Sequence, residues 1–248
     1  MDTQGSAKEA FQAVRGSPLY DKKLKMYKVN ASLAAMPEEI GRCRVFTPGW
    51  LENESIWLHM EYKYILELLK KGLYKEFFED FKNVAIPFQK PTRYGRSILE
   101  NSSFLVSSAF PDQRLHGSGF VARLSGATAE FISIWLLMCL GQKPFYLNED
   151  KELCLEFKPV LPAWLFSQRQ EFSLPKNTFA FKFLNKILVV YHNPKRKDTF
   201  GPQAAKIQEI TITDDNKTAS VIGSSVISSP AAQAIREGKV SRIDIVLN

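Results

Sequence analysis

The sequence is poor in the residues that form disulfides, metal sites and membrane anchors. Its three cysteines lie far apart without metal-ligand spacing, which favours reduced thiols over a disulfide framework: Cys43, Cys139 and Cys154. No apolar run is long enough to span a bilayer, and the N-terminus has no signal-peptide core. These absences predict a cytoplasmic protein with no membrane partner.

Several catalytic signatures are also missing. The sequence has no GxSxG elbow, HExxH pair, CxxC pair or GxxxxGK[ST] loop. The common hydrolase, zinc, redox and triphosphate interpretations therefore lack support, and neither a metal nor a cofactor is expected. The formal net charge is +7, but basic residues are interspersed with acidic ones. Solubility is then a sufficient reason for the charge, and no nucleic-acid partner is expected.

Hydrophobic residues make up 45% of the 248 residues, enough for one large domain or two smaller ones. Apolar residues recur at helical spacing before residue 150 and alternate with polar ones after it. The patterns predict helices near 8–14, 50–72, 73–84, 97–109 and 125–141, the second capped by Asn53 or Ser55. Strands of a β-sandwich follow, with one short helix capped by Ser229. The predicted class is α+β, with 1–150 as part of an α/α barrel or bundle and 151–248 as the sandwich.

The segment 118–141, SGFVARLSGATAEFISIWLLMCLG, joins a small-residue turn to an apolar helix. Ser125 can cap the first helical turn, Gly126 lets a ligand approach the backbone, and Gly141 can end the helix in the left-handed conformation. The unpaired N–H groups and positive dipole end of the helix start suit an anion such as phosphate. A plain helix cap is the alternative, and most Ser-Gly helix starts are of that kind.

Other polar residues have ordinary structural explanations. His59 lies among apolar neighbours on a predicted helix, where a lone histidine is more often a core residue than a ligand. Glu100 stands at capping-box spacing from Ser97, so capping its own helix is a sufficient reason for it. The glycines of the loop 114–119 can simply form a turn. The residues alone therefore predict a cytoplasmic α+β protein with a candidate anion site.

Four separated segments carry a further signal. They are GWLENESIWLH at 49–59, SILENSSFLVSSA at 97–109, ARLSGATAEF at 122–131 and PVLPAWLF at 159–166. In this order they resemble the C-terminal half of inverting sugar phosphorylases of glycoside hydrolase family 94, which includes cellobiose and chitobiose phosphorylases. Segments 93–100 and 115–130 are most similar to the 1,2-β-oligoglucan phosphorylase branch. The resemblance runs from about residue 17 to the end.

This resemblance implies an (α/α)6 catalytic barrel followed by a jelly-roll-like β-sandwich, and a chain that corresponds to the C-terminal part of a longer enzyme. Phosphate would be held by His59, Ser125 and Gly126; many family members have threonine in place of Ser125, and serine retains the hydroxyl. The residues near the sugar would be Glu100, Arg114 and His116. The general-acid aspartate, and an arginine that helps to hold phosphate, would lie upstream of this chain.

The implied reaction cleaves β-linked gluco-oligosaccharides with inorganic phosphate, the co-substrate, to give α-glucose 1-phosphate. The partners would be the oligosaccharide and phosphate, with a homodimer as the family's further expectation. Two alternatives stay open: a noncatalytic carbohydrate-binding or scaffold protein, and an (α/α)-barrel hydrolase that would need a carboxylate such as Glu100 near its site. Since phosphate needs both groups at once, we expect His59 and the Ser125-Gly126 turn to lie close together.

Overall fold

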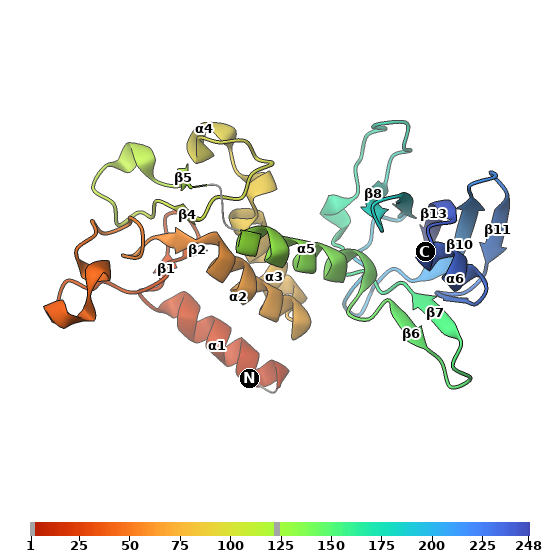
Figure 1. Ribbon diagram of the computed structural model, residues 1–248, viewed down its shortest axis with the longest axis horizontal. Coiled ribbons are helices and arrows are strands. Elements are labelled where there is room, and N and C mark those ends of the chain that lie inside the picture. The colour runs from red at the N-terminus through yellow and green to blue at the C-terminus, as the bar shows by residue number, and fades with distance from the viewer. Residues whose placement is uncertain (1–2, 122–124) are drawn as a thin grey trace. The chain divides into compact units, whose positions relative to one another are not determined.

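The computed structural model describes residues 3–121 and 125–248; for Ser125 only the backbone position at the start of a helix is described. The chain divides into two compact units, Met1–Ile134 and Trp135–Asn248 (Figure 1). This division falls earlier than the boundary near residue 150 that the sequence predicts. Long helices belong mainly to the first unit and most strands to the second, so the α+β class is confirmed.

Three helices of the first unit follow the predicted periodicity: α1 (Gln4–Gly16), α2 (Leu58–Lys70) and α3 (Tyr74–Val84). Helices α2 and α3 pack against each other. Phe77, Phe78 and Phe81 of α3 are buried, and their rings contact one another. The apolar stripe of each helix thus forms the core, as amphipathic helices require.

Helix α2 starts differently from the prediction. Its N-cap is Trp57, which makes no side-chain cap hydrogen bond, so neither Asn53 nor Ser55 caps it. Instead, the Asn53 amide donates to the carbonyl of Phe46, and the Ser55 hydroxyl donates to the carbonyl of Leu51. Both polar side chains stabilise the loop before the helix.

The predicted helix at 97–109 is wrong, because this segment contains strand β4 (Phe104–Leu105). It lies between β3 (Ile56–Trp57) and β5 (Gly119–Phe120) in an antiparallel sheet. Its serines bind distant partners: the Ser103 hydroxyl donates to the carbonyl of Val121 at 2.6 Å. Serine side chains compete with helical backbone bonds, and here the long-range partners prevail.

Short elements complete the first unit: β1 (Tyr20–Asp21), β2 (Met26–Tyr27), α4 (Pro91–Tyr94) and the 3-10 helices η1 (Glu38–Ile40), η2 (Arg42–Arg44), η3 (Ile86–Phe88) and η4 (Gln113–Leu115). Strands β1 and β2 pair as a hairpin. The buried Asp21 carboxylate accepts hydrogen bonds from the N–H and hydroxyl of Ser108, at 2.7 and 2.8 Å. These bonds tie the segment after β4 to that hairpin.

Helix α5 (Ser125–Leu140) confirms the predicted apolar helix. Gly141 follows it with a φ of +96°, and its N–H donates to the carbonyl of Leu137 at 3.0 Å. A Cβ at this position would lie 2.9 Å from the Cβ of Lys158. Both the left-handed backbone and the close neighbour therefore require glycine. Within 3–121 and 125–248, no helix combines the length and apolar character needed to cross a membrane.

The second unit contains a five-stranded sheet in the order β11-β10-β13-β9-β8. Its strands are β8 (Thr178–Phe183), β9 (Ile187–His192), β10 (Ile207–Asp214), β11 (Ala219–Ile222) and β13 (Val240–Leu247). Strands β13 and β9 pair in parallel, whereas the other pairs are antiparallel. Ile243, Ile245 and Leu247 alternate with less buried residues along β13, as a strand with one core face requires.

A three-stranded sheet contains β6 (Phe145–Leu147), β7 (Leu153–Glu156) and β12 (Val226–Ser228), with β7 in the centre; the unit also holds η5 (Ala163–Leu165). Phe145 of β6 stacks on Phe183 of β8, with ring centroids 6.0 Å apart, so the two sheets are in contact. Helix α6 (Ala231–Arg236) follows β12, and its N-cap is Pro230. Ser229 is therefore not its cap as predicted; its hydroxyl donates to the carbonyl of Leu153.

Candidate functional site

His59 lies against Gly126 at the start of α5. A Cβ added to Gly126 would be 2.8 Å from Nδ1 and 2.9 Å from Cε1 of the imidazole. Real Cβ contacts are not that short, so a side chain at position 126 would push the ring away. His59 is placed by the first turn of α2, where the preceding Leu58 is fully buried. The expected closeness of His59 and this turn is thus present, while the Ser125 side chain lies outside the described residues.

Glu130 lies one helical turn after Gly126 and faces the same imidazole. Its Oε1 is 3.8 Å from Nε2 of His59, and the two side chains are 21% and 33% exposed. Residues four apart on a helix share a face, which explains why Gly126 and Glu130 meet the same ring. The imidazole therefore has helix backbone beside Nδ1, a carboxylate near Nε2, and partial access to solvent.

A second set of polar groups joins α2, the segment before β4 and α5. The buried Tyr62 hydroxyl of α2 donates to Asn101 Oδ1 at 3.0 Å, and Asn101 Nδ2 donates to Thr128 Oγ1 at 3.4 Å. Burial raises the pKa of Tyr62, so its hydroxyl keeps its proton. Asn101, Thr128 and Glu130 were not predicted as site residues. The sequence did contain one indication of Glu130: it lies four residues after Gly126, the spacing that places two residues on the same face of a helix.

The first turn of α5 can receive an anion. The first four N–H groups of an α-helix have no intrahelical acceptor, and the dipole adds partial positive charge there. In α5 these groups include those of Gly126 and Ala127, close to the His59 ring. Because Gly126 carries no side chain, an anion can approach the backbone beside the imidazole.

Two of the predicted sugar-binding residues are exposed and paired with neighbours. Glu100 is 3.5 Å from Arg96 in an exposed ion pair, and its N–H donates to the Ser97 carbonyl at 3.1 Å, so it ends a turn rather than caps a helix. Arg114 donates through Nε and Nη2 to Asp112. These hydrogen bonds lower the pKa of Asp112 to about 2.

His116 is buried in contrast, and both of its ring nitrogens are occupied. The Lys23 ammonium donates to Nδ1 at 2.9 Å, so Nε2 carries the proton and donates to the Phe110 carbonyl at 2.8 Å. This arrangement suits a residue that holds its loop in place. The structure therefore brings together His59 and Gly126, but no hydrogen bond or ion pair of the described chain joins Glu100, Arg114 or His116 to them.

Across the described ranges, no group of three or more His, Cys, Asp or Glu side chains is placed to hold a metal ion. No protein-family model matches this sequence, and no curated protein matches it. The features of this chain that bear on its function are therefore the segments at 49–59, 97–109, 122–131 and 159–166 and the geometry around His59.

Proposed function

We propose that this chain provides the phosphate-binding part of an inverting sugar phosphorylase of glycoside hydrolase family 94. The enzyme would cleave β-linked gluco-oligosaccharides with inorganic phosphate and release α-glucose 1-phosphate. The observation that carries the proposal is the contact between His59 and Gly126. Two residues far apart in the sequence, each in a segment that resembles the family, meet at a helix start that suits an anion. The first unit would then belong to an (α/α)6 barrel, and the second would be a jelly-roll-like β-sandwich.

Phosphate would be held by three kinds of group. The N–H groups of Gly126 and Ala127 would donate to its oxygens, together with the Ser125 hydroxyl and the imidazole of His59. Glu130 would orient the ring through Nε2, which leaves Nδ1 on the side of Gly126. Of the residues proposed near the sugar, Glu100 and Arg114 are exposed, and His116 would act by holding the loop that carries Arg114.

In the proposed reaction, a phosphate oxygen attacks the anomeric carbon from one face of the sugar. A carboxylic acid on the other face protonates the leaving oxygen, so the configuration at carbon inverts, as in inverting glycosidases. The site of this chain would position the phosphate and balance its charge. The resemblance assigns no residue of this chain to the role of general acid, so none is proposed for it.

The three histidines make a direct NMR test of the phosphate site. Titration with inorganic phosphate should shift the ring signals of His59 and the amide signals of Gly126 and Ala127. His116 has both nitrogens occupied, and Nε2 of His192 is 2.7 Å from Asp244, so these two rings serve as internal controls. Replacing His59 with Ala should weaken the response of Gly126. Equal shifts at all three rings, or none at His59, would contradict the proposal.

A turnover assay tests the assignment of the acid. We expect this chain alone to release no glucose 1-phosphate from 1,2-β-oligoglucans and phosphate, because general-acid catalysis typically contributes about 10²–10⁴-fold. Steady turnover by the purified chain would show that the acid lies among its own residues. Binding without turnover is the expected combination.

A further inference from the structure

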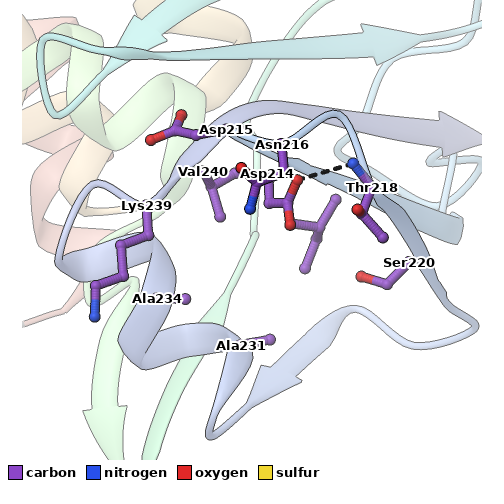
Figure 2. Close-up of a pocket in the computed structure, with 10 residues that line it drawn as sticks. Asp214, Asp215, Asn216, Thr218, Ser220, Ala231, Ala234, Lys239 and Val240 are labelled. Carbon is purple, nitrogen blue, oxygen red and sulfur yellow. Dashed lines mark hydrogen bonds between the residues drawn. The ribbon is translucent and has the colours of Figure 1, made fainter.

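The second unit contains a hollow of about 610 Å³ between helix α6 and the β10–β11 hairpin (Figure 2). Asp214, Thr218 and Ser220 line it from the hairpin side, and Ala231 and Ala234 line it from the helix. This volume lies within the range of about 300–1,000 Å³ that is usual for small-molecule sites. None of these residues belongs to the proposed phosphate site.

The walls of the hollow are held by hydrogen bonds within the unit. Lys186 Nζ donates to Asp215 Oδ2 at 2.7 Å and to the Gly238 carbonyl at 2.5 Å, which ties the hairpin turn to the end of α6. Asp214 Oδ1 accepts from the N–H of Thr218 at 2.8 Å, the dashed line in Figure 2. Strand β10 also pairs with β13 on its other side. The hollow is thus bounded by fixed elements.

The lining offers hydrogen-bond groups opposite a small apolar surface. Within the part of the chain that the structure describes, the second carboxylate oxygen of Asp214 has no partner, and the hydroxyl of Ser220 can donate and accept. Helix α6 contributes only the methyl groups of Ala231 and Ala234 to the lining, while its Ala232 and Ile235 are fully buried. The short side chains of Ala231 and Ala234 leave the space open.

Two of the three charged groups in the lining already have partners. Asp215 pairs with Lys186 at 2.7 Å, and Lys239 pairs with Glu237 at 2.5 Å. An anion would meet the remaining carboxylate, Asp214, and a compact hydrated cation would gain nothing from the alanine methyl groups opposite it. A neutral ligand with several hydroxyl groups and an apolar face matches both walls. We propose that this hollow binds a neutral polyhydroxylated compound such as one sugar residue, with its hydroxyls on Asp214 and Ser220 and its C–H face on Ala231 and Ala234.

An NMR titration of the full chain with D-glucose tests this site. We expect the amide signals of Thr218, Ser220 and Ala234 to shift in a saturable way at millimolar concentrations. Ala234→Leu should fill the hollow and weaken binding at least about tenfold. Val221→Thr is the matched control, because Val221 is 63% exposed and successive residues of β11 point to opposite faces. That variant should bind as the original chain does.

Three outcomes would overturn the proposal. They are an absence of saturable shifts with glucose, equal binding by the Ala234→Leu variant, and a stronger response to methylammonium or inorganic phosphate than to glucose. Ser220→Ala gives a second variant in case Ala234→Leu disturbs folding, and it should weaken binding several-fold through the loss of one hydroxyl. The signals of His59 report phosphate binding separately, so either proposal can fail alone.

Discussion

At the scale of single residues, the imidazole of His59 can lie against the start of α5 only because Gly126 has no side chain. We expect Gly126→Ala to displace the ring and to weaken phosphate binding at least about tenfold, or about 1.4 kcal/mol. Alanine is also the better helix former by up to about 1 kcal/mol, so part of the cost in stability is offset. Phosphate titration by NMR and urea unfolding measure the two effects separately.

Gly16→Ala is the control for this substitution. Gly16 is the last residue of α1, and a Cβ there would meet no atom within 4 Å. The control should leave the phosphate response of the Gly126 amide unchanged. If Gly126→Ala bound phosphate as well as the control, His59 would not be part of the site.

Asp80 predicts an unusual pH dependence of stability. Its buried carboxylate accepts hydrogen bonds from Arg15 at 2.7 Å and from the Tyr27 hydroxyl at 2.8 Å. Burial raises the pKa to about 6, against the lowering effects of Tyr27 and Arg15, whereas the ordinary value is 3.8. Between these values the folded chain keeps a proton that the unfolded chain loses. The free energy of unfolding should therefore fall by about 2–3 kcal/mol from Asp80 as pH rises from about 4 to about 6.

Urea unfolding at several pH values in this window measures the effect. Asp80→Asn should make the slope shallower, while Asp215→Asn, which changes a half-exposed side chain, should keep it. Some slope should remain, because burial also raises the pKa of Glu61. Asp244 does not add to this slope. Burial raises its pKa, but hydrogen bonds from Arg242 and His192 outweigh burial and lower the pKa to about 2. Its contribution to the free energy of unfolding is therefore lost only as the pH falls below about 4. A slope unaffected by Asp80→Asn would count against the protonated carboxyl.

At the scale of elements, periodicity predicted the long helices and most strands, because their core faces follow a regular local pattern. It failed at 97–109, where the partners that decide the structure are distant in sequence. Ser103 binds Val121, and Ser108 binds Asp21. The start of α2 was misplaced for a similar reason, since Asn53 bonds to Phe46 in the loop. No local pattern contains these contacts.

In the candidate site, too, some features follow from the local sequence and others depend on contacts between distant residues. His59, Ser125 and Gly126 were proposed from a resemblance and from the chemistry of a helix start, and the structure places His59 beside Gly126. Asn101 and Thr128 meet only through the fold of the segment before β4, so their contact could not be read from the sequence. His116 was proposed near the sugar, but its exchange of hydrogen bonds with Lys23 and Phe110 depends on long-range packing.

Strand β5 depends on Gly119, for which the sequence pattern indicates only a turn. A Cβ at Gly119 would overlap Ser102 Oγ and the ring of Tyr94. We expect Gly119→Ala to destabilise the chain by about 1–3 kcal/mol, as overpacking of a closed core does, and to disturb the pairing of β4 with β5. The measurement is urea unfolding, with amide signals of Phe104 and Leu105 as local reporters.

Gly5→Ala is the matched control for this prediction. Its added Cβ would have only an ordinary contact of 3.8 Å with Thr3, and Gly5 lies within helix α1. Alanine there should leave stability unchanged or raise it slightly. Equal stability of the two variants would mean that the small sheet can open without cost.

At the scale of the whole molecule, the two proposed sites should differ in how strongly their binding depends on salt. The chain carries a formal net charge of +7, which attracts an anion from a distance but has little effect on a neutral polyol. The Debye length shrinks from about 30 Å at 0.01 M salt to about 3 Å at 1 M, so both the overall field and the local charges are screened. Phosphate binding near His59 should weaken several-fold over this range, whereas glucose binding beside Asp214 should change little.

Sodium chloride titrations during both NMR experiments check this difference on one sample. Chloride can also compete with phosphate for the N–H groups of α5, and this competition acts in the same direction as screening. A neutral osmolyte is unsuitable as a control, because it could itself occupy the site that is being tested with glucose. The control is therefore a second salt with a larger anion. If phosphate binding were insensitive to both salts, a charge-assisted site at Gly126 would be excluded. If glucose binding fell in parallel, the hollow beside α6 would not be the site for a neutral ligand that we propose.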